Sequence, residues 1–559
     1  MYEDNELEQV APFLLIIITL AGAFLRVFLI SRTGLWLDEA FSVWMANHPV
    51  GEMLQWISNI DQHPPLYYLL LHSWVANFGN TPYYARALSA LFGAATIPVI
   101  YLTGKRLSGV MVGLAAAVFM ALSPFHIYYS QEARMYTLLT FNAAVAIYAL
   151  VRLLTDPRSV SPIGSHFRAY LHAWRTSEPV EPDTNKEFSY KDQIPDQTGW
   201  RGWISRHRWL PIQAVETDLA WVAFIIFTAA TLLTHNTAVF YLLAVNIFVL
   251  GLILLHRNRK PEHTPALRAP SLGSWIKAHI GILVLWSPWL VVFIRQAARV
   301  DQEFWIPKPT WDSVTQTLQS LINASVPGQA SQVIVMWILV AVLCLGLVYY
   351  RKKLSIFFLL AALFAVPVLG ELIVSIRRPI FFDRTLIWIT IPLFLLMAAG
   401  IAQLKFRFLM IVVLAAIGVN YLFSNGDFYR FVRKEDWSGP AGYVSYYSER
   451  GDLILFNSAM VQIPFDYYFK AHESKNFLQV ERQGVPDMFN RGIPEPKMTD
   501  SDIPDLISLL DGRNRVWLVY SHNDYTDPLG LIPKTLASKM KLTQQRDFYG
   551  SKVQLYEAP

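Results

Sequence analysis

The chain has 559 residues, of which 53% are hydrophobic, 14% aromatic and only 16% charged, with a formal net charge of +5. Soluble chains carry about 25% charged residues, whereas this one repeats apolar runs of about 20 residues, long enough to cross a bilayer. The composition excludes an ordinary soluble protein and predicts a polytopic α-helical membrane protein. The positive charge does not indicate nucleic-acid binding, because basic residues of membrane proteins mostly flank the spans.

The apolar runs predict eleven transmembrane helices. They are expected at about residues 10–30, 83–103, 108–124, 136–154, 218–234, 237–256, 277–294, 332–350, 354–375, 385–402 and 406–424. The first run follows an acidic N-terminus without a small-residue cleavage site, so we interpret it as a retained span rather than a signal peptide. Basic residues gather in alternate connections, at 105–106, 257–260, 351–353 and 405–407. Because cytoplasmic loops are the basic ones, we expect a cytoplasmic N-terminus and an outer location for everything after about residue 425.

Two domains are expected, a transmembrane module at 1–424 and a small α/β domain on the outer face at 425–559. The module includes a first outer loop at 31–82 with short interfacial helices, a cytoplasmic insertion at 155–215 to which we assign no chemistry, and another outer loop at 297–330. In the second domain we predict buried strands at 453–456 and 516–520, a short helix at 504–510 and an edge strand at 552–557. That domain has no glycine-rich phosphate loop and no metal-ligand cluster in its sequence.

Asp38 and Glu39 are the first candidates for chemistry. They directly follow the first apolar run, among Trp36, Leu37 and Trp44. Carboxylates at a membrane surface are costly unless they pair or react, so a functional role is the first hypothesis. The structural alternative is a helix N-terminus, with Asp38 as the cap and Glu39 in the first turn.

Two further polar segments are expected on the same outer side. In the segment 61–68, the two prolines after His63 hold the backbone extended, so that the imidazole can donate to an anionic headgroup. The alternative is a solvated histidine before an interfacial helix. In the segment 123–136, Glu132 and Arg134 are too close in sequence to face each other on a helix, so Glu132 is expected to approach the Asp38–Glu39 pair. A polar turn with an aromatic belt is the alternative there.

A cluster of arginines breaks the expected charge pattern. Arg377, Arg378 and Arg384 surround Asp383 on the face where basic residues should be scarce. An ion pair with Asp383 neutralises only one of the three arginines, so positive charge remains. Arginine binds phosphate through a planar fork. We therefore expect an anionic ligand at the outer leaflet. Two more arginines at the end of the seventh span, Arg295 and Arg299, can add to this positive field.

Carboxylates, a histidine and surplus arginines on one outer face indicate a reaction of a lipid-linked phosphate. Nucleotide-activated donors are not supplied on that face, so a group carried by a membrane lipid is the economical substrate. We expect the arginines to bind the lipid phosphate and a carboxylate to deprotonate an acceptor hydroxyl, a form of general-base catalysis that contributes about 10²–10⁴-fold. Stabilising the departing phosphate is the other large contribution.

Four fragments resemble the GT-C membrane glycosyltransferases in their order along the chain and in the side of the membrane on which they are expected. They are Leu37–Ala40, His63–Tyr67, Ala85–Ser89 and Ser130–Arg134. The nearest branch is that of protein O-mannosyltransferases and the lipid A aminoarabinose transferase. The resemblance covers about residues 10–424, and the fragment Lys434–Trp437 is similar to bacterial members of unassigned substrate.

The resemblance implies an inverting transfer from a polyprenyl-phosphate sugar, with Asp38 as the base. Glu39 is adjacent in the same pair, Glu132 is the supporting carboxylate, and His63 lies near the donor phosphate. The residues we predict to bind that phosphate are His63, Arg134, Arg378 and Arg384. The residues we predict to line the substrate pocket are Trp36, Tyr67, Tyr128 and Tyr129. The resemblance leaves open a divalent metal at Asp38 or Glu39.

The expected partners are the polyprenyl-phosphate sugar, membrane lipids and an acceptor hydroxyl on a protein, lipid or polysaccharide, in a bacterial inner membrane. The main alternative is a transporter or flippase for a lipid-linked glycan. Transporters usually carry internal repeats and interrupted helices at mid-membrane, whereas here the charges lie at one face. A polysaccharide polymerase or ligase of different fold is a second alternative, and it would not require the acidic pair directly after the first span.

Overall fold

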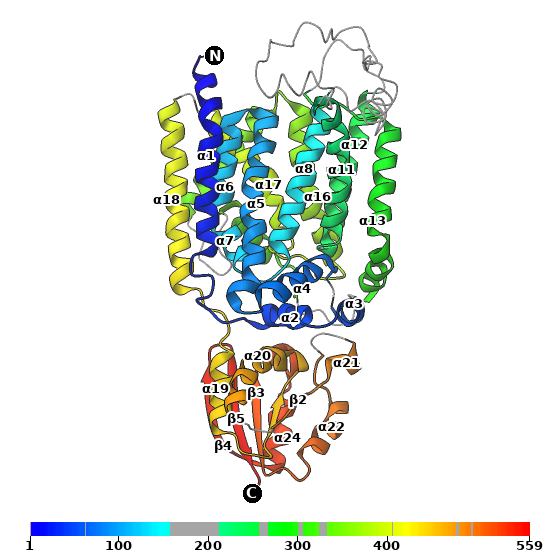
Figure 1. Cartoon of the computed structure of the whole chain (residues 1–559), viewed down its shortest axis with the longest axis vertical. Helices are drawn as coiled ribbons and strands as arrows, with labels where there is room; N and C mark the ends of the chain where they lie inside the picture. The colour runs from blue at the N-terminus through cyan, green and yellow to red at the C-terminus, as the bar shows by residue number, and fades with distance from the viewer. Residues whose placement is uncertain are drawn as a thin grey trace.

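A computed structural model describes residues 2–61, 63–156, 212–256, 266–299, 306–323, 333–404, 406–476, 480–492 and 496–559. Nearly all of the predicted insertion at 155–215 lies outside these residues. A bundle of long helices stands above a smaller mixed domain, and the N-terminus and the C-terminus lie at opposite ends of the molecule (Figure 1).

The predicted membrane spans are confirmed as helices. Among the described residues, seven helices are long and apolar enough to cross a membrane. They are α1 (Tyr2–Val27), α5 (Pro82–Ser108), α8 (Tyr136–Thr155), α12 (Val239–His256), α13 (Leu272–Arg299), α16 (Leu354–Ser375) and α18 (Arg407–Phe431). The helices α6 (Val110–Leu122) and α7 (Pro124–Ser130) are together long and apolar enough for one further span, with a bend of 54° between them. Three other apolar helices, α11 (Ile212–Leu232), α15 (Val333–Tyr350) and α17 (Thr390–Ala402), account for the remaining predicted spans.

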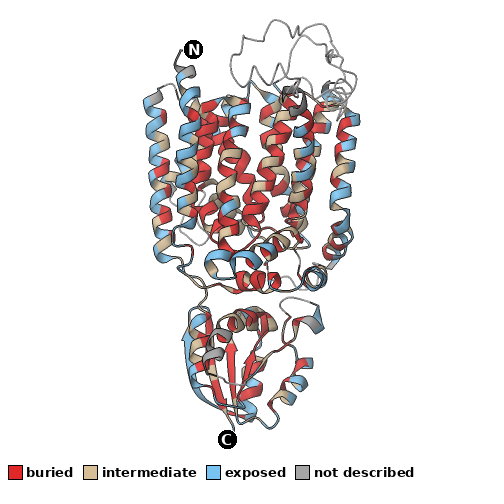
Figure 2. Cartoon of the chain, viewed as in Figure 1, coloured by how far each residue is buried: buried red, intermediate tan, exposed pale blue. Residues whose placement is uncertain are grey.

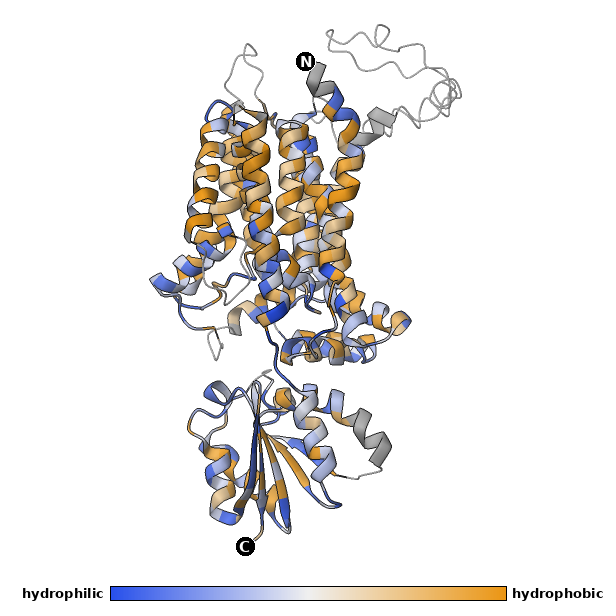
Figure 3. Ribbon diagram, turned by 90° about the vertical axis from the view of Figure 1, so that its left-hand side faces the viewer, coloured by the Kyte–Doolittle hydropathy of each residue, from blue (hydrophilic) through white to orange (hydrophobic). Residues whose placement is uncertain are grey.

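The bundle has a buried centre and an apolar surface. In the most apolar 18-residue stretch of α8, 78% of the residues are buried, compared with 17% in α1 and 22% in α13. The helix α8 is therefore central, and the other two are peripheral. Phe13, Leu20 and Phe24 of α1 are exposed. Figure 2 places buried residues in the middle of the bundle, and Figure 3 shows apolar residues along its outer helices. A surface of this kind faces lipid rather than water.

The segment 31–82, predicted as the first outer loop, folds into three short helices across the end of the bundle opposite the N-terminus (Figure 1). They are α2 (Leu37–Ala46), α3 (Val50–Asn59) and α4 (Leu66–Phe78). Met53 and Ile57 bury one face of α3, and Trp44 stacks on Trp56 with ring centroids 4.8 Å apart. The loop is thus a packed layer that can position polar side chains. In the other outer loop, the described residues 306–323 contain α14 (Trp311–Asn323).

The C-terminal domain is an α/β sandwich with the strand order β2-β1-β3-β5-β4. Its strands are β1 (Leu453–Phe456), β2 (Glu481–Gly484), β3 (Arg515–Tyr520), β4 (Lys541–Phe548) and β5 (Ser551–Glu557). The first three are parallel, and β5 runs antiparallel to both β3 and β4. The helices are α19 (Ser438–Tyr447), α20 (Ala459–Asn476), α21 (Met488–Arg491), α22 (Ile503–Leu510), α23 (Asn523–Thr526) and α24 (Leu531–Lys539).

The strands at 453–456 and 516–520 and the helix at 504–510 match their predictions. The predicted edge strand at 552–557 is wrong in one respect, because β5 is interior and the two edges of the sheet are β2 and β4. The segment Lys541–Phe548 is polar and almost wholly exposed, so it lacks the apolar alternation by which strands are found. In addition, α18 continues to Phe431, so the domain boundary predicted at 424 falls inside this helix.

The C-terminal domain contacts the first outer loop directly. The hydroxyl of Tyr468 in α20 accepts a hydrogen bond from the Leu35 N–H at 2.6 Å, and the Tyr467 hydroxyl donates to the Asn80 carbonyl at 3.0 Å. Gly34 lies so close to Tyr468 that an added Cβ would be 2.7 Å from its hydroxyl. The C-terminal domain therefore contacts the segment before α2 and the loop after α4.

Candidate functional site

Glu39 is a fully buried carboxylate bound by Arg86 of α5. The Arg86 Nε donates to Oε1 at 2.7 Å and Nη2 donates to Oε2 at 2.6 Å, the two-pronged geometry of a strong ion pair. The Ala133 N–H also donates to Oε1, at 2.9 Å. Burial alone would raise the pKa of Glu39, but the charges of Arg86 and Lys434 outweigh it and lower the pKa to about 2. Glu39 is thus a fixed anion.

Arg86 also organises the entry to the first outer loop. Its Nη1 donates to the carbonyl oxygens of Ile30 and Thr33 at 2.7 and 2.9 Å, and its Nη2 donates to that of Gly34 at 2.7 Å. These carbonyls precede α2, so one guanidinium holds both the approach to this helix and its Glu39. Arg86 belongs to a fragment singled out in the sequence, but no role was predicted for it.

Asp38 occupies a different environment from its neighbour Glu39. Its side chain keeps 21% exposure, and its Oδ2 lies 3.3 Å from the Arg384 Nη1 and 3.9 Å from the Arg134 Nε. Burial raises the pKa of Asp38, but the charges of Arg134 and Arg384, with His63 and His522, lower it by more. Asp38 is therefore an ionised, partly accessible carboxylate between two arginines.

The Asp38–Arg134 contact is supported by the backbone of α2. The Arg134 Nη1 donates to the Asp38 carbonyl at 3.4 Å and to the Ser42 Oγ at 3.3 Å. The structural alternative for the acidic pair holds only in part: the N-cap is Trp36 rather than Asp38, and Glu39 does lie in the first turn. Asp38 instead lies in the first turn, with its side chain directed to the two arginines.

Arg384 is held by aromatic rings and by its neighbour. Its guanidinium lies over the rings of Tyr136 and Phe382, at 5.6 and 5.1 Å from their centroids. The carboxylate of Asp383 accepts from the Arg384 N–H at 2.7 Å and from the Tyr129 hydroxyl at 3.4 Å. Burial of Asp383 raises its pKa. The arginine is thereby directed towards Asp38 with 14% of its side chain exposed.

Glu132 shares a cation with Glu39. The Lys434 Nζ lies 3.4 Å from the Glu132 Oε1 and 3.4 Å from the Glu39 Oε2. Burial raises the pKa of Glu132, and Lys434 offsets part of that rise. The predicted approach of Glu132 to the acidic pair therefore occurs through a lysine that the sequence reasoning did not identify as a site residue. The only signal for it was the fragment Lys434–Trp437.

His63 lies beside this cluster, with 23% of its side chain exposed. Its Nδ1 is 2.9 Å from the Asp61 Oδ1, and its ring centroid is 5.5 Å from that of His235. The Gln296 Nε2 of α13 donates to the Asp61 carbonyl at 2.8 Å. Burial raises the pKa of Asp61, but His63, together with Arg134 and the Tyr68 hydroxyl, lowers it by more. Pairing of Nδ1 orients the ring, and His235 is a neighbour that the sequence did not predict.

The other predicted residues lie in two settings. Trp36 and Tyr128 are half-buried, and each ring has the Lys434 Nζ 5.8 Å from its centroid. Tyr67 is fully buried, and its hydroxyl contacts the Ser89 Oγ at 3.0 Å, which donates in turn to the Arg134 carbonyl at 3.0 Å. Tyr67 therefore supports the backbone of Arg134. Tyr129 is buried against Asp383.

The remaining predicted arginines lie elsewhere. The Arg378 Nη1 donates to the Ala297 carbonyl near the end of α13, and Arg295 and Arg377 are exposed. The side chain of Arg299 is outside the described residues. Arg384 is therefore the member of the predicted group that the structure pairs with Asp38.

The carboxylates do not fit a divalent metal. The Glu39 oxygens are taken by Arg86 and Lys434, and Asp38 has two guanidinium groups within 4 Å. A metal ion there would meet positive charge instead of further oxygen ligands. Within the described ranges, no group of three or more His, Cys, Asp or Glu side chains is arranged to hold a metal.

These features define a polytopic membrane protein with the GT-C fold of membrane glycosyltransferases, which confirms the resemblance found in the sequence. The chain matches ArnT from Cupriavidus metallidurans in the apo state, with a TM-score of 0.57, 13% identity and coverage of 97% of each chain. The same protein bound to undecaprenyl phosphate matches with a TM-score of 0.55 and 12% identity, again over 97% of each chain. The archaeal oligosaccharyltransferase AglB from Archaeoglobus fulgidus matches with a TM-score of 0.47 and 10% identity, over 97% of this chain and 74% of that one.

The sequence itself gives a more particular match. Residues 62–164 fit the family described as dolichyl-phosphate-mannose-protein mannosyltransferase. This range contains His63, Arg86, Glu132 and Arg134. No curated protein sequence matches the chain significantly.

Proposed function

We propose that the protein is a glycosyltransferase that moves a sugar, with inversion, from a polyprenyl-phosphate donor to an acceptor hydroxyl. The observation that carries the proposal is the partly exposed Asp38 carboxylate between Arg134 and Arg384, at one end of a membrane bundle. The mannosyltransferase match over 62–164 and the likeness to ArnT support it, since ArnT was crystallised with undecaprenyl phosphate.

In the proposed reaction the acceptor oxygen attacks the anomeric carbon on the face opposite the phosphate. The bond between that carbon and the phosphate oxygen breaks, and the polyprenyl phosphate leaves with the electron pair. Arg384, Arg134 and His63 bind the phosphate and stabilise the departing charge. Asp38 takes the proton of the acceptor hydroxyl.

The basicity of Asp38 depends on whether the two arginines also bind a donor phosphate. Without donor, they keep the pKa of the carboxyl low, so that Asp38 is ionised but weakly basic. A bound phosphate shares the positive charge of Arg384 and Arg134, and Asp38 thereby becomes more basic when the donor is in place. The proposal thus makes base strength depend on donor binding.

We further propose that this face is the outer face of a bacterial inner membrane, with the N-terminus in the cytoplasm. The basic connections at 105–106 and 351–353 lie at the end of the bundle that carries the N-terminus, as the positive-inside rule requires. The acceptor is a hydroxyl of a protein, a lipid or a polysaccharide.

The proposal is tested with purified protein in lipid nanodiscs and a panel of polyprenyl-phosphate sugars. Slow release of free polyprenyl phosphate from one donor, with water replacing the acceptor, is the expected result. Binding is measured in parallel, and binding followed by movement of intact donor across a vesicle membrane would favour the transporter instead. A protein that binds no member of the panel would contradict both.

Replacing Arg384 with alanine is expected to weaken donor binding. Hydrogen bonds to charged groups contribute about 1.5–3 kcal/mol, so the donor KM should rise about 10–100-fold. Arg377→Ala is the matched control, because Arg377 is exposed and lies in the same connection. Steady-state rates over a range of donor concentrations measure the effect. An unchanged donor KM in Arg384→Ala would remove Arg384 from the phosphate site.

A further inference from the structure

The linker between α18 and the C-terminal domain passes through the candidate site. It joins Phe431 to Ser438, and its Lys434 side chain is only 9% exposed. The ammonium group lies 3.4 Å from the Glu39 Oε2, 3.4 Å from the Glu132 Oε1 and 3.3 Å from the Gln131 carbonyl. An ammonium group has three N–H donors, and three oxygen atoms surround this one.

The neighbouring residues attach the linker to α2. The Glu435 Oε2 accepts from the Leu37 N–H at 3.1 Å and from the Trp437 indole N–H at 2.9 Å. The first N–H groups of a helix have no partner within the helix. Glu435 provides the hydrogen-bond acceptor for the Leu37 N–H, although the two residues are almost four hundred positions apart in the chain. The position of α2, and hence of Asp38 and Glu39, is thereby coupled to the linker.

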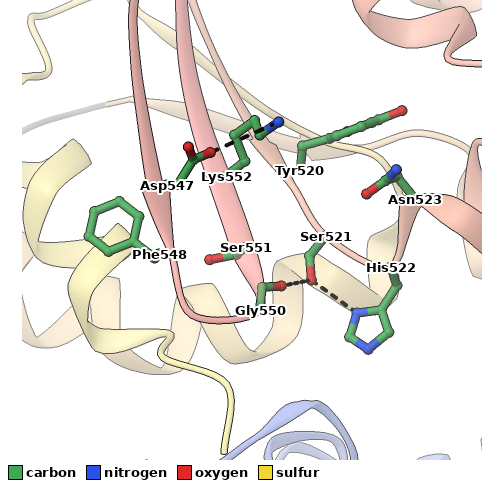
Figure 4. Close-up of a pocket in the computed structure, with 9 residues that line it drawn as sticks. All are labelled: Tyr520, Ser521, His522, Asn523, Asp547, Phe548, Gly550, Ser551 and Lys552. Carbon is green, nitrogen blue, oxygen red and sulfur yellow. Dashed lines mark hydrogen bonds and ion pairs between the residues drawn. The ribbon is translucent and has the colours of Figure 1, made fainter.

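The C-terminal domain fixes the other side of the linker. The Glu435 Oε1 lies 3.1 Å from the His522 Nε2, and the Asp436 N–H donates to the Tyr549 carbonyl at 2.9 Å. Figure 4 shows His522 joined through Ser521 to Gly550, in a hollow of about 290 Å³ between the end of β3 and the β4–β5 turn. Gly550 has a φ of +84°, and a Cβ there would lie 2.7 Å from the Glu435 Cγ. A glycine is required at this turn for the domain to approach the linker.

We propose that Lys434 is a positioning residue of the transferase site, set in place by the C-terminal domain. Glu132 is 1% exposed, the Tyr128 hydroxyl hydrogen-bonds to its carboxylate, and Lys434 is the cation that pairs with it within the described part of the chain. Removing this cation leaves a buried carboxylate without its ion-pair partner, which is strongly unfavourable. The proposal rests on the transferase function proposed above.

The effect of Lys434 on the reaction is indirect. Glu132 and Arg134 belong to one tight segment, in which the Arg134 N–H donates to the Glu132 carbonyl at 2.8 Å. Arg134 in turn faces the Asp38 carboxylate. A shift of Glu132 therefore displaces Arg134 relative to Asp38, whereas Lys434 itself is already surrounded by protein oxygens and by the rings of Trp36 and Tyr128.

The first test compares Lys434→Met with Arg433→Met in the full-length protein. Both remove one positive charge from adjacent linker positions, but Arg433 is exposed. Lys434→Met is expected to lower kcat about 10²-fold, as misplacement of reacting groups does, and to raise the donor KM as well, because the displaced Arg134 also binds the donor phosphate. Lys434→Arg should recover most of the rate, and Arg433→Met should match the unchanged protein. Equal activity of the two methionine variants would overturn the proposal, as would a raised donor KM at unchanged kcat.

The second test needs no substrate. A double-mutant cycle with Lys434→Met and Glu132→Gln is followed by thermal unfolding of the full-length protein. Lys434→Met should lower Tm, and Glu132→Gln in the same chain should restore most of the loss, because it removes the unpaired charge. Additive effects would overturn the pairing. If the pairing is found but the unchanged protein releases polyprenyl phosphate from no donor, the proposed transferase function fails and the placement of Lys434 stands.

Discussion

Replacing Asp38 with asparagine is expected to abolish transfer while donor binding persists. The amide has the shape of the carboxylate but cannot accept the acceptor proton, so turnover should fall by at least about 10²–10⁴-fold. Donor affinity should stay the same or improve, because the negative charge that competes for Arg134 and Arg384 is gone. Release of polyprenyl phosphate and donor binding are measured on the same preparation.

Glu52→Gln is the control for this variant. Glu52 is an exposed carboxylate of α3 in the same outer loop, so its amide variant should behave like the unchanged protein. Unaltered turnover by Asp38→Asn would exclude Asp38 as the base. Loss of donor binding in that variant would indicate that Asp38 holds the site together rather than acting on the acceptor.

Replacing Arg86 with methionine is expected to cause the largest loss of stability. Glu39 would remain buried without its bidentate partner, a change that costs about 3–5 kcal/mol, and three carbonyls before α2 would lose their donor. Thermal unfolding measures the loss. Adding Glu39→Gln should recover a large part of it, because the unpaired charge disappears.

Arg106→Met provides the comparison on the same helix. Arg106 lies near the other end of α5, is exposed and donates to the Thr155 hydroxyl. Exposed polar contacts contribute little, so Tm should change only slightly. If Arg86→Met unfolded at the same temperature as Arg106→Met, the Arg86–Glu39 pair would not anchor the first outer loop.

The helices of the membrane module could be predicted from the sequence because each apolar run is long enough to cross a bilayer and is bounded by polar residues. The edge strand was not predictable in the same way, since Lys541–Phe548 pairs through its backbone and carries few apolar side chains. The short helices of the first outer loop were expected as a group, from their tryptophans and aliphatic residues.

The site was predictable only in part. The structure brings Asp38, Glu132, Arg134 and Arg384 together, and their catalytic roles stay predictions. The adjacent carboxylates looked equivalent in the sequence, but consecutive residues of a helix point about 100° apart. Asp38 therefore faces Arg134 and Arg384, whereas Glu39 faces Arg86 inside the protein.

The contributions of Arg86 and Lys434 depend on contacts between distant segments. Lys434 comes from the far end of the module, on a side where basic residues are expected to be few. Its position follows from the packing of the C-terminal domain on the outer loop, through Glu435 and Tyr549, and no local rule predicts such a contact.

The course of the linker has a practical consequence for work on the two domains. A chain truncated after α18 loses the lysine of the acidic cluster together with the soluble domain, so its inactivity would not demonstrate acceptor recognition by that domain. Chimaeras that exchange the soluble domain should be joined after Trp437, so that Glu435, the residue that faces Gly550, is retained. During evolution this junction is expected to tolerate insertions poorly, although it looks like an ordinary connector between a membrane anchor and an outer domain.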